Sequence, residues 1–384
     1  MNKKPLVISC FGIYLDQTNV CAYRQISGLN NYSTHVVTRK IQNRDQYPFE
    51  ALTCIKKPSN FIMRKWRKLI YRKLLNRLMP ISKDQALQML DIANKLNADI
   101  IHVYMGTEAV QLLPYLRIEK RPKIVSFHGV DTSKVITDLN LKEIQDNVDL
   151  ILVRCEHMKS ILVERGCSPS CIRLNTTGVP MPEKIDLNKS YEFTESNPMR
   201  LVQSCRLIEK KGLDVTIKVI EKLKQKIRFV SLDIYGSGPD EKSLRKQVEE
   251  LGLESNVRFN GFFANKRLLK ELKNYHFFVH PSRETNKADR EGIPNSMLEA
   301  MAYGVPVIAT RHSGIPEVIN HDVNGFLVES PDSKPIAKLI LEASSSDSKC
   351  KEMAEAAAQT VKGAFSLSHN IALLEDAYSE VYRI

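Results

Sequence analysis

Several features that mark common classes of protein are missing from this sequence. No run of about 18 or more consecutive apolar residues occurs, so no segment reads as a membrane-spanning helix. The first apolar run, Leu6–Cys10, is too short for the apolar part of a secretion signal followed by a cleavage site. We therefore expect a cytoplasmic chain that contacts a membrane, if at all, only at its surface.

Motifs for metal binding and for several common chemistries are also missing. The eight cysteines form no metal-binding pattern, since Cys167 and Cys171 are spaced C-x3-C without a second pair. No Asp-x-Asp pair follows a predicted strand to hold a divalent ion, and the P-loop, G-x-S-x-G and H-E-x-x-H motifs do not occur. The first strand-to-helix turn, Phe11–Tyr14, is not a dinucleotide-binding fingerprint. The sequence predicts a reducing compartment, no metal and no cofactor.

Negative charge is scarce in the first half of the chain. Residues 1–180 hold 27 Lys and Arg against 15 Asp and Glu, a net charge of +12, whereas residues 181–384 hold 29 of each kind. This asymmetry predicts an anionic surface or ligand for the first half only. Aromatic residues suited to stacking on bases are few near the most basic run, apart from Trp66 and Tyr71. Nucleic acid is therefore not an expected partner.

The basic excess includes the segment Lys56–Leu78, which fits an amphipathic helix. One helical face collects apolar residues, namely Met63, Trp66, Ile70, Leu74 and Leu78, and the other collects Arg64, Lys65, Lys68 and Arg72. Such a helix suits an anionic membrane surface. The alternative is a helix that packs its apolar face into the domain and leaves a solvated basic face. The sequence leaves both open.

Short apolar runs alternate with amphipathic stretches, as in α/β folds of parallel strands and crossover helices. We expect two doubly wound, Rossmann-like parallel-sheet domains with a cleft between them. They span residues 1–180 and 199–366, with a polar linker at 181–198 and a last helix at 367–384 that crosses back to the first domain. Strands are expected at 6–10, 35–38, 100–103, 123–127, 150–153, 172–175, 200–204, 228–235, 257–260, 277–280, 305–309 and 325–327.

One loop that leads into a helix stands out in the second domain. Pro294 suits the start of a helix, because its missing N–H costs nothing there. The amides of Asn295 and Ser296 then point out of a helix N-terminus, where anions bind. Glu291 precedes the turn, and Glu299 lies about 7–8 Å further along the helix axis. A phosphate with a sugar beside it fits this spacing, although an ordinary exposed loop and helix also explains these residues.

Three further residues follow predicted strands, where open α/β sheets bind ligands. His128 follows the strand at 123–127, and Arg206 and Lys211 bracket the turn after 200–204. Arg and Lys are the usual pair for a diphosphate at such a turn. Taken alone, His128 is more often a structural hydrogen bonder, and the basic turn is more often solvated.

Taken in order along the chain, these motifs resemble the retaining, GT-B-fold glycosyltransferases of family 4. The residues that carry the resemblance are Phe127-His128-Gly129, Arg206 with Lys211-Gly212, Gly236-Ser237-Gly238-Pro239, Glu291 through Ala302 with its E-x7-E spacing, Gly304–Val307 and Asn324–Val328. The wording Glu291–Pro294 with His312–Glu317 is most similar to the colanic-acid-type exopolysaccharide transferases of that family. One departure is the first loop, Tyr14–Asn19, where many relatives carry a glycine pair.

The resemblance implies roles for seven residues. Arg206 and Lys211 would hold the diphosphate of a nucleotide sugar, with backbone amides near Ile293 and Asn295. Glu299 would accept hydrogen bonds from the ribose and Glu291 would contact the donor sugar. His128 would lie near that sugar and stabilise the transition state.

The expected reaction is retaining, metal-independent transfer of a hexose from a UDP-sugar, or from GDP-mannose, to a saccharide or polyprenyl-diphosphate-linked acceptor. It would take place at the inner face of the plasma membrane during exopolysaccharide or lipopolysaccharide synthesis. Two alternatives remain open at this point. One is a sugar-nucleotide epimerase of the same architecture, and the other is a non-catalytic basic membrane-surface binder.

Overall fold

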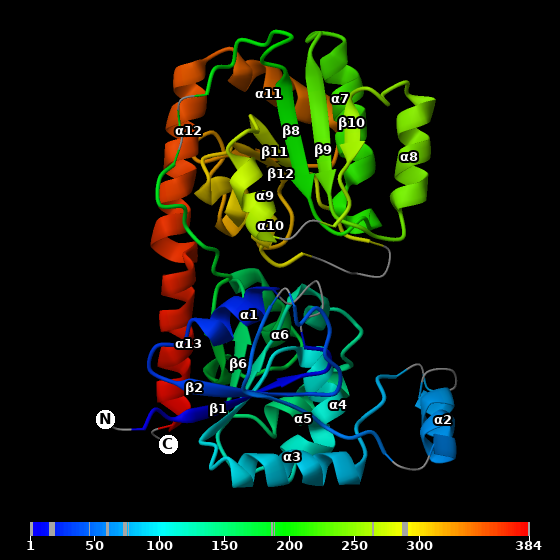
Figure 1. Cartoon of the computed structure of the whole chain (residues 1–384), viewed down its shortest axis with the longest axis vertical. Helices are drawn as coiled ribbons and strands as arrows, with labels where there is room; N and C mark the ends of the chain where they lie inside the picture. Colours follow the sequence, from blue (N-terminus) through cyan, green and yellow to red (C-terminus); the bar gives the residue numbers. More distant parts are fainter. Residues whose placement is uncertain are drawn as a thin grey trace. The chain divides into compact units, whose positions relative to one another are not determined.

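The computed structural model describes residues 3–14, 20–45, 47–58, 61–71, 75, 77–185, 187, 189–262, 265–285 and 291–382. The chain forms two compact units, each described here by itself. Unit 1 consists of Met1–Gly178 together with Leu367–Ile384, and unit 2 consists of Val179–Ser366. In each unit, helices flank a parallel sheet (Figure 1).

In unit 1 the described residues form a seven-stranded parallel sheet in the order β3-β2-β1-β4-β5-β6-β7. Its strands are β1 Leu6–Phe11, β2 Ser33–Thr38, β3 Leu52–Cys54, β4 Ile100–Val103, β5 Lys123–Ser126, β6 Leu150–Val153 and β7 Ile172–Leu174. Its helices are α1 Val20–Ser27, α2 Phe61–Leu69, α3 Lys83–Lys95, α4 Gly106–Leu116, α5 Asp138–Gln145, α6 Glu156–Glu164 and α13 Leu367–Tyr382. The central strands are buried on both faces, which explains their continuous apolar runs.

The last helix of the chain, α13, belongs to the core of unit 1. Leu374, Tyr378 and Val381 are buried against residues of β1, β4, β5 and β6. Polar contacts add to this packing, because the Glu375 carboxylate accepts hydrogen bonds from the backbone amides of Asn30 and Asn31 at 2.5 and 2.8 Å. The Tyr378 hydroxyl is also 2.7 Å from the buried His102 ring.

In unit 2 the described residues form a six-stranded parallel sheet in the order β10-β9-β8-β11-β12-β13. Its strands are β8 Met199–Ser204, β9 Val230–Tyr235, β10 Val257–Phe259, β11 Phe277–His280, β12 Val307–Thr310 and β13 Phe326–Val328. Its helices are α7 Leu213–Lys224, α8 Glu241–Glu250, α9 Asn265–Leu272, α10 Asn295–Ala302, α11 Ser333–Ser344 and α12 Asp347–Thr360. One core cluster joins β8, β9 and β11 to α7, α8 and α11.

The expected α/β class with two Rossmann-like parallel sheets is confirmed. Details differ where local signals are weak. The short edge strand β3 is missing from the expected strands. Within the segment Lys56–Leu78, the helix α2 spans Phe61–Leu69, and residues 59–60, 72–74 and 76 lie outside the described residues.

The polar segment 181–198, expected as a linker, packs on unit 2 over its described residues. Tyr191 is buried in the core of that unit. The Lys189 ammonium donates hydrogen bonds to the backbone carbonyls of Tyr275 and Gly304, at 2.9 and 3.2 Å. The composition of the segment hid these contacts, because a single buried tyrosine and one lysine contacting main-chain oxygens give no periodic signal.

Candidate functional site

The strand order of unit 2 reverses between β8 and β11. The loops that follow these two strands leave the sheet in opposite directions, and in open α/β folds the crevice between such loops binds ligands. The loop after β8 carries Arg206 and Lys211, and the segment after β11 carries Glu291 and the start of α10. The fold thus brings together residues that are far apart in the sequence.

The turn after β8 depends on one glycine. Gly212 has a φ of +63°, a left-handed conformation that costs other residues free energy. A Cβ atom there would lie 2.1 Å from the backbone oxygen of Pro281, which follows β11. The Gln203 side chain fixes the same turn by donating a hydrogen bond to the Lys211 carbonyl oxygen at 2.8 Å. The Lys211 backbone is therefore held against the end of the sheet.

Lys211 and Glu291 form an ion pair. The ammonium nitrogen lies 2.6 Å from Oε1 of the carboxylate, and both side chains are almost buried, at 12% and 8% exposed. The hydroxyl of Ser313 donates a hydrogen bond to the Glu291 carbonyl oxygen at 2.5 Å and helps fix this residue. Such a pair in a low dielectric is strongly coupled, so removal of either partner leaves an uncompensated buried charge.

Glu291 stays ionised at every physiological pH. Burial alone raises the pKa of its carboxyl group. Lys211, Lys210 and His280 lower this pKa by more than burial raises it, so the result is about 2. The pair therefore offers a carboxylate, which accepts hydrogen bonds, beside an ammonium group, which donates them.

Helix α10 begins beside this pair. Pro294 is its N-cap residue, and no side chain caps the first turn, so the amides of Asn295 and Ser296 have no acceptor within the helix. The Ser296 hydroxyl donates a hydrogen bond to the Ser204 carbonyl oxygen at 2.6 Å and ties the helix start to the end of β8. Ile293 is buried and Asn295 is half-buried. This end of α10 has the geometry of an anion site.

Two further predicted residues lie in the same loops but in different surroundings. The Arg206 side chain is exposed on the turn after β8. Glu299 lies in the second turn of α10 and is only 3% exposed. Arg206 is therefore available to a ligand from solvent, whereas Glu299 is a buried carboxylate.

His128 belongs to unit 1 and follows β5. Its backbone amide donates a hydrogen bond to Oδ2 of the buried Asp131 at 2.8 Å, and the Thr107 amide donates to Oδ1 of the same carboxylate, also at 2.8 Å. Burial, and to a lesser extent the Arg154 guanidinium, lowers the pKa of the His128 imidazole to about 3. The ring is therefore neutral at physiological pH and is no source of a proton.

Arg154, which follows β6, is not among the residues predicted from the sequence. The residue is 4% exposed, and its guanidinium donates hydrogen bonds to O and Oδ1 of Asn175, both at 3.1 Å. Its Nη2 lies 3.4 Å from Nε2 of His128. The imidazole also has a hydrogen bond to the Tyr104 backbone, which helps to fix the orientation of the ring.

His280, the last residue of β11, was also missed. It is fully buried, and neither ring nitrogen has a hydrogen-bond partner among the described residues. Burial is the main cause that lowers its pKa, to about 3, and Lys211 adds to the effect. The sequence could have singled out His280 by its position at the carboxyl end of a predicted strand. Its burial could not be predicted from the sequence.

No group of three or more His, Cys, Asp or Glu residues lies close enough to hold a metal ion within the part of the chain that the structure describes. Across the same residues, no helix combines the length and the apolar character needed to cross a membrane.

The part of the chain that matches a known family profile lies within unit 2. A sequence profile described as "Glycosyl transferases group 1" matches residues 186–360. The amylovoran biosynthesis glycosyltransferase AmsK of Erwinia amylovora is 30% identical over 275 residues, which cover 70% of this chain and 67% of the relative. The putative colanic acid biosynthesis glycosyltransferase WcaL of Escherichia coli is 31% identical over 253 residues, 64% of this chain and 62% of the relative.

Solved structures agree on the fold. Anabaena Alr3699/HepE in complex with UDP and glucose superposes with a TM-score of 0.76 at 17% identity, over 98% of this chain and 100% of the other. The sucrose-phosphate synthase of Thermosynechococcus elongatus gives 0.75 at 15% identity, over 99% and 100%. The expected GT-B fold and family are confirmed, and the chain belongs to the group 1 glycosyl transferases.

Proposed function

We propose that this chain is a retaining glycosyltransferase that moves a hexose from a nucleotide-diphosphate sugar, with a UDP-sugar favoured over GDP-mannose, onto a saccharide or a polyprenyl-diphosphate-linked acceptor. The product would belong to an exopolysaccharide or another cell-surface polysaccharide. The observation that carries this proposal is the Lys211–Glu291 ion pair beside the uncapped start of α10. It combines a cation for phosphate with a carboxylate for sugar hydroxyls.

The leaving diphosphate would be held by Lys211, Arg206 and the amides at the start of α10. A lysine ammonium has three donors, so Lys211 keeps two for phosphate oxygens while one faces Glu291. Exposed Arg206 adds a guanidinium fork that matches phosphate geometry. These charges would offset the negative charge that develops as the nucleoside diphosphate departs. We therefore propose that no metal and no cofactor is required.

The sugar and the ribose would be recognised by carboxylates and by a neutral histidine. Ionised Glu291 would accept hydrogen bonds from hydroxyls of the donor sugar, and Glu299 would accept them from the ribose. His128 would hydrogen-bond the sugar as a neutral imidazole, since its pKa of about 3 leaves it uncharged. The donor phosphate, rather than a protein nucleophile, would assist the incoming hydroxyl and retain the anomeric configuration.

Relatives support the class of substrate. AmsK and WcaL are described as biosynthetic glycosyltransferases for amylovoran and colanic acid, and HepE was solved with UDP and glucose. The HepE complex supports a UDP-sugar donor, and the descriptions of AmsK and WcaL support a polysaccharide product for this chain.

A transfer assay with UDP- and GDP-sugars tests the proposal. Glu291→Gln and Lys211→Met should each lower kcat/KM by at least about 100-fold, as expected for lost contacts to a reacting diphosphate or sugar. The matched control is the exposed Lys246–Glu250 pair of α8, whose nitrogen and oxygen are 3.0 Å apart. Lys246→Met and Glu250→Gln should leave activity unchanged. Full activity in both site variants would refute the assignment.

The product separates the proposal from its runner-up. NMR of the new linkage should show the anomeric configuration of the donor sugar, and inversion would refute the retaining mechanism. An epimerase would convert the nucleotide sugar without any acceptor. A reaction that proceeds equally well without acceptor would therefore favour the epimerase.

We also propose that α2 attaches unit 1 to an anionic membrane surface. Its apolar residues Ile62 and Trp66 are 69% and 61% exposed, and Figure 1 shows α2 standing apart from the sheet of unit 1. This exposure supports the membrane alternative, because a helix that packed inward would bury those side chains. The basic residues Arg64, Lys65 and Lys68 would face lipid headgroups. The enzyme would then work in the cytoplasm at the inner face of the plasma membrane.

Sedimentation with phosphatidylglycerol vesicles tests the membrane proposal. Ile62→Ser with Trp66→Ser should weaken binding by at least about tenfold, since each buried apolar side chain contributes about 1.5–3 kcal/mol. The control replaces Val323, which is 52% exposed on unit 2, by Ser and should leave binding unchanged. Equal sedimentation of all three proteins would refute the role of α2.

A further inference from the structure

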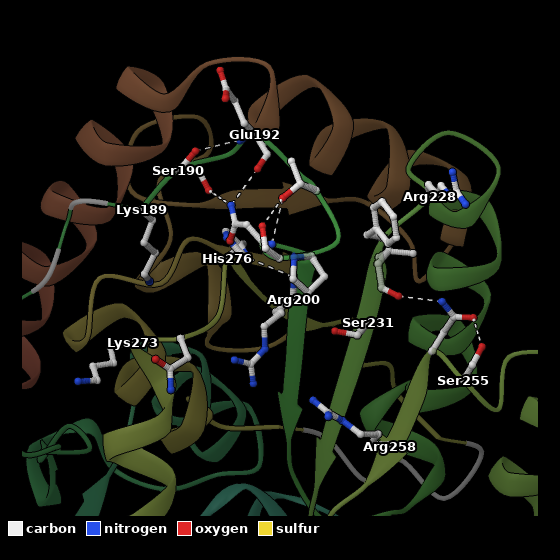
Figure 2. Close-up of a pocket in the computed structure, with 18 residues that line it drawn as sticks. Lys189, Ser190, Glu192, Arg200, Arg228, Ser231, Ser255, Arg258, Lys273 and His276 are labelled. Atoms are coloured by element: carbon white, nitrogen blue, oxygen red, sulfur yellow. Dashed lines mark hydrogen bonds between the residues drawn. The ribbon is translucent and has the colours of Figure 1, made fainter.

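A large hollow opens in unit 2 at the amino ends of the strands of its sheet (Figure 2). It is lined by residues at the amino ends of β8 and β9, including Arg200 and Ser231, and by His276 just before β11. Its volume is about 1090 Å³. The candidate donor residues follow the carboxyl ends of β8 and β11 instead. The hollow is therefore a separate site.

The lining of the hollow is basic. Five side chains of the lining are cationic, namely Lys189, Arg200, Arg228, Arg258 and Lys273, whereas Glu192 is the one acidic residue among the described residues that line it. Figure 2 shows Arg200 on β8 and Arg258 on β10, the two strands that flank β9, with Lys189 and Lys273 on the other side of Arg200 from Arg258 in this view. Such a concentration of one sign favours an anionic ligand.

Two arginines of the lining share one buried carboxylate. Asp233 accepts hydrogen bonds from Nε and Nη2 of Arg258 at 2.8 and 2.9 Å, and from the Tyr275 hydroxyl at 3.0 Å. The Arg200 Nη2 lies 3.5 Å from the same carboxylate, and the Arg200 guanidinium stacks 4.7 Å from the Tyr275 ring centre. One carboxylate thus serves two guanidinium groups, so positive charge exceeds negative charge in this part of the lining.

The wall of the hollow is fixed rather than a loose surface loop. The Lys189 ammonium is anchored on the carbonyl oxygens of Tyr275 and Gly304. The Asn197 side-chain amide donates a hydrogen bond to the Glu192 carbonyl oxygen at 2.8 Å. The Arg200 backbone amide donates a hydrogen bond to Nδ1 of buried His276 at 3.0 Å. A site with a preformed wall loses less entropy when a ligand binds.

The rest of the lining suits a saccharide. Hydroxyl and amide side chains dominate it, including Thr194, Ser196, Ser231, Ser255 and Asn274, and apolar residues are few. These groups hydrogen-bond sugar hydroxyls, whereas a base or a lipid chain would need an apolar surface. We propose that the hollow binds an anionic saccharide, whose carboxylate or phosphate is held by Arg200 and Lys273 while the polar rim holds its sugar rings.

Calorimetric titration of the whole chain at low salt tests this site. The probe is a tetrasaccharide of alternating glucuronic acid and N-acetylglucosamine, and the comparison probes are neutral maltotetraose and inorganic phosphate. We expect saturable, salt-sensitive binding of the acidic tetrasaccharide. The Kd of the acidic tetrasaccharide should be at least about tenfold lower than the Kd of either comparison probe, because one charge-assisted hydrogen bond contributes about that factor.

Variants locate the binding. Arg200→Gln should raise the Kd for the tetrasaccharide about tenfold, and Lys273→Gln, on an exposed residue whose loss does not endanger folding, should raise it by a smaller factor. Lys338→Gln, on a side chain 76% exposed on α11, is the matched control and should leave the Kd unchanged. The midpoint of thermal unfolding reports whether each variant folds. Three outcomes would overturn the proposal: no saturable binding, equal affinity for maltotetraose or phosphate, or an unchanged Kd in both site variants. Because donor transfer is not measured, these outcomes are independent of the proposed glycosyltransferase activity.

Discussion

Units 1 and 2 are built on the same kind of parallel sheet but use their charged residues differently. Unit 1 holds 28 Lys and Arg against 18 Asp and Glu, a net charge of +10, and part of that excess lies on α2, which also exposes Trp66. Unit 2 holds 28 against 26 and is nearly neutral, yet it contains the buried Lys211–Glu291 pair and, at the opposite end of its strands, a basic hollow. Net charge therefore points to a surface partner, whereas a chemical site is found only from local pairing.

Glu291 of unit 2 and His128 of unit 1 differ in how their surroundings set their charge. Glu291 is kept ionised beside a lysine, with its pKa lowered to about 2. His128 is kept neutral beside an arginine, with its pKa lowered to about 3. A nearby cation favours the ionised form of a carboxyl group and disfavours the protonated form of an imidazole. The site residue of unit 2 is therefore charged and that of unit 1 is neutral.

The largest expected effect comes from breaking the ion pair of unit 2. Lys211→Met should lower the free energy of unfolding by about 3 kcal/mol, because Glu291 is left buried and unpaired. Lys246→Met breaks an exposed pair and should cost at most about 1 kcal/mol. Urea unfolding of both variants measures the difference. The double variant Lys211→Met with Glu291→Leu should regain most of the loss, and a double variant as unstable as the single one would contradict the account.

Removing the positive charges of α2 in unit 1 should weaken membrane binding, whereas removing as many charges from unit 2 should not. Replacing Arg64, Lys65 and Lys68 by Gln removes three charges worth about 1 kcal/mol each near an anionic surface, so partition onto phosphatidylglycerol vesicles should fall about 100-fold. The same loss of charge on unit 2, from Lys242, Arg245 and Lys246 of α8, should change partition little. Equal effects of both triple variants would show that only net charge matters.

A smaller effect concerns the acid sensitivity of unit 2. His280 has a pKa of about 3 when folded, below the ordinary 6.5, so its contribution to stability is full above pH 6.5 and is lost as the pH falls toward 3. Between pH 7 and pH 5 this loss should amount to about 2 kcal/mol. His280→Leu should remove it from the pH dependence of unfolding. The exposed His369→Leu is the control, and an identical pH slope in both variants would contradict the prediction.

The smallest effect tests the neutral histidine of unit 1. Arg154→Gln removes the cation whose Nη2 lies 3.4 Å from the His128 ring, so the pKa of His128 should rise from about 3. It should stay below 6.5, because burial is the larger cause of the shift. NMR titration of the His128 ring signals, assigned with His128→Ala, measures this change. An unmoved pKa would exclude Arg154 as a cause.

Most of the fold was predictable because its signals are local. The strands Ile100–Val103, Leu150–Val153 and Phe277–His280 match the expected bounds, since runs of buried apolar residues between turns leave few alternatives. Strand β3 was missed because only three residues form it, at an edge and partly exposed. Its pairing with β2 is a tertiary contact that gives no pattern in the sequence.

The positions of the candidate residues at strand ends were predictable from the sequence, but their contacts were not. Strand ends and the helix start singled out Glu291, Lys211 and His128, while the pairing of Lys211 with Glu291 depends on how β8 and β11 lie together. Arg154 and His280 were missed for a related reason. Both residues are polar and buried, and burial of a single polar residue is decided by the whole fold.

The place of α13 in unit 1 has a consequence for synthesis on the ribosome. The core of unit 1 includes Tyr378, so this core is incomplete until α13 has been made. Unit 2 is one continuous stretch, Val179–Ser366, and can fold first, although it is translated second. Unit 1 must wait with apolar strands uncovered and close a contact of very long sequence separation at the end. Premature termination just before Leu367 would therefore harm the half of the protein that was made first.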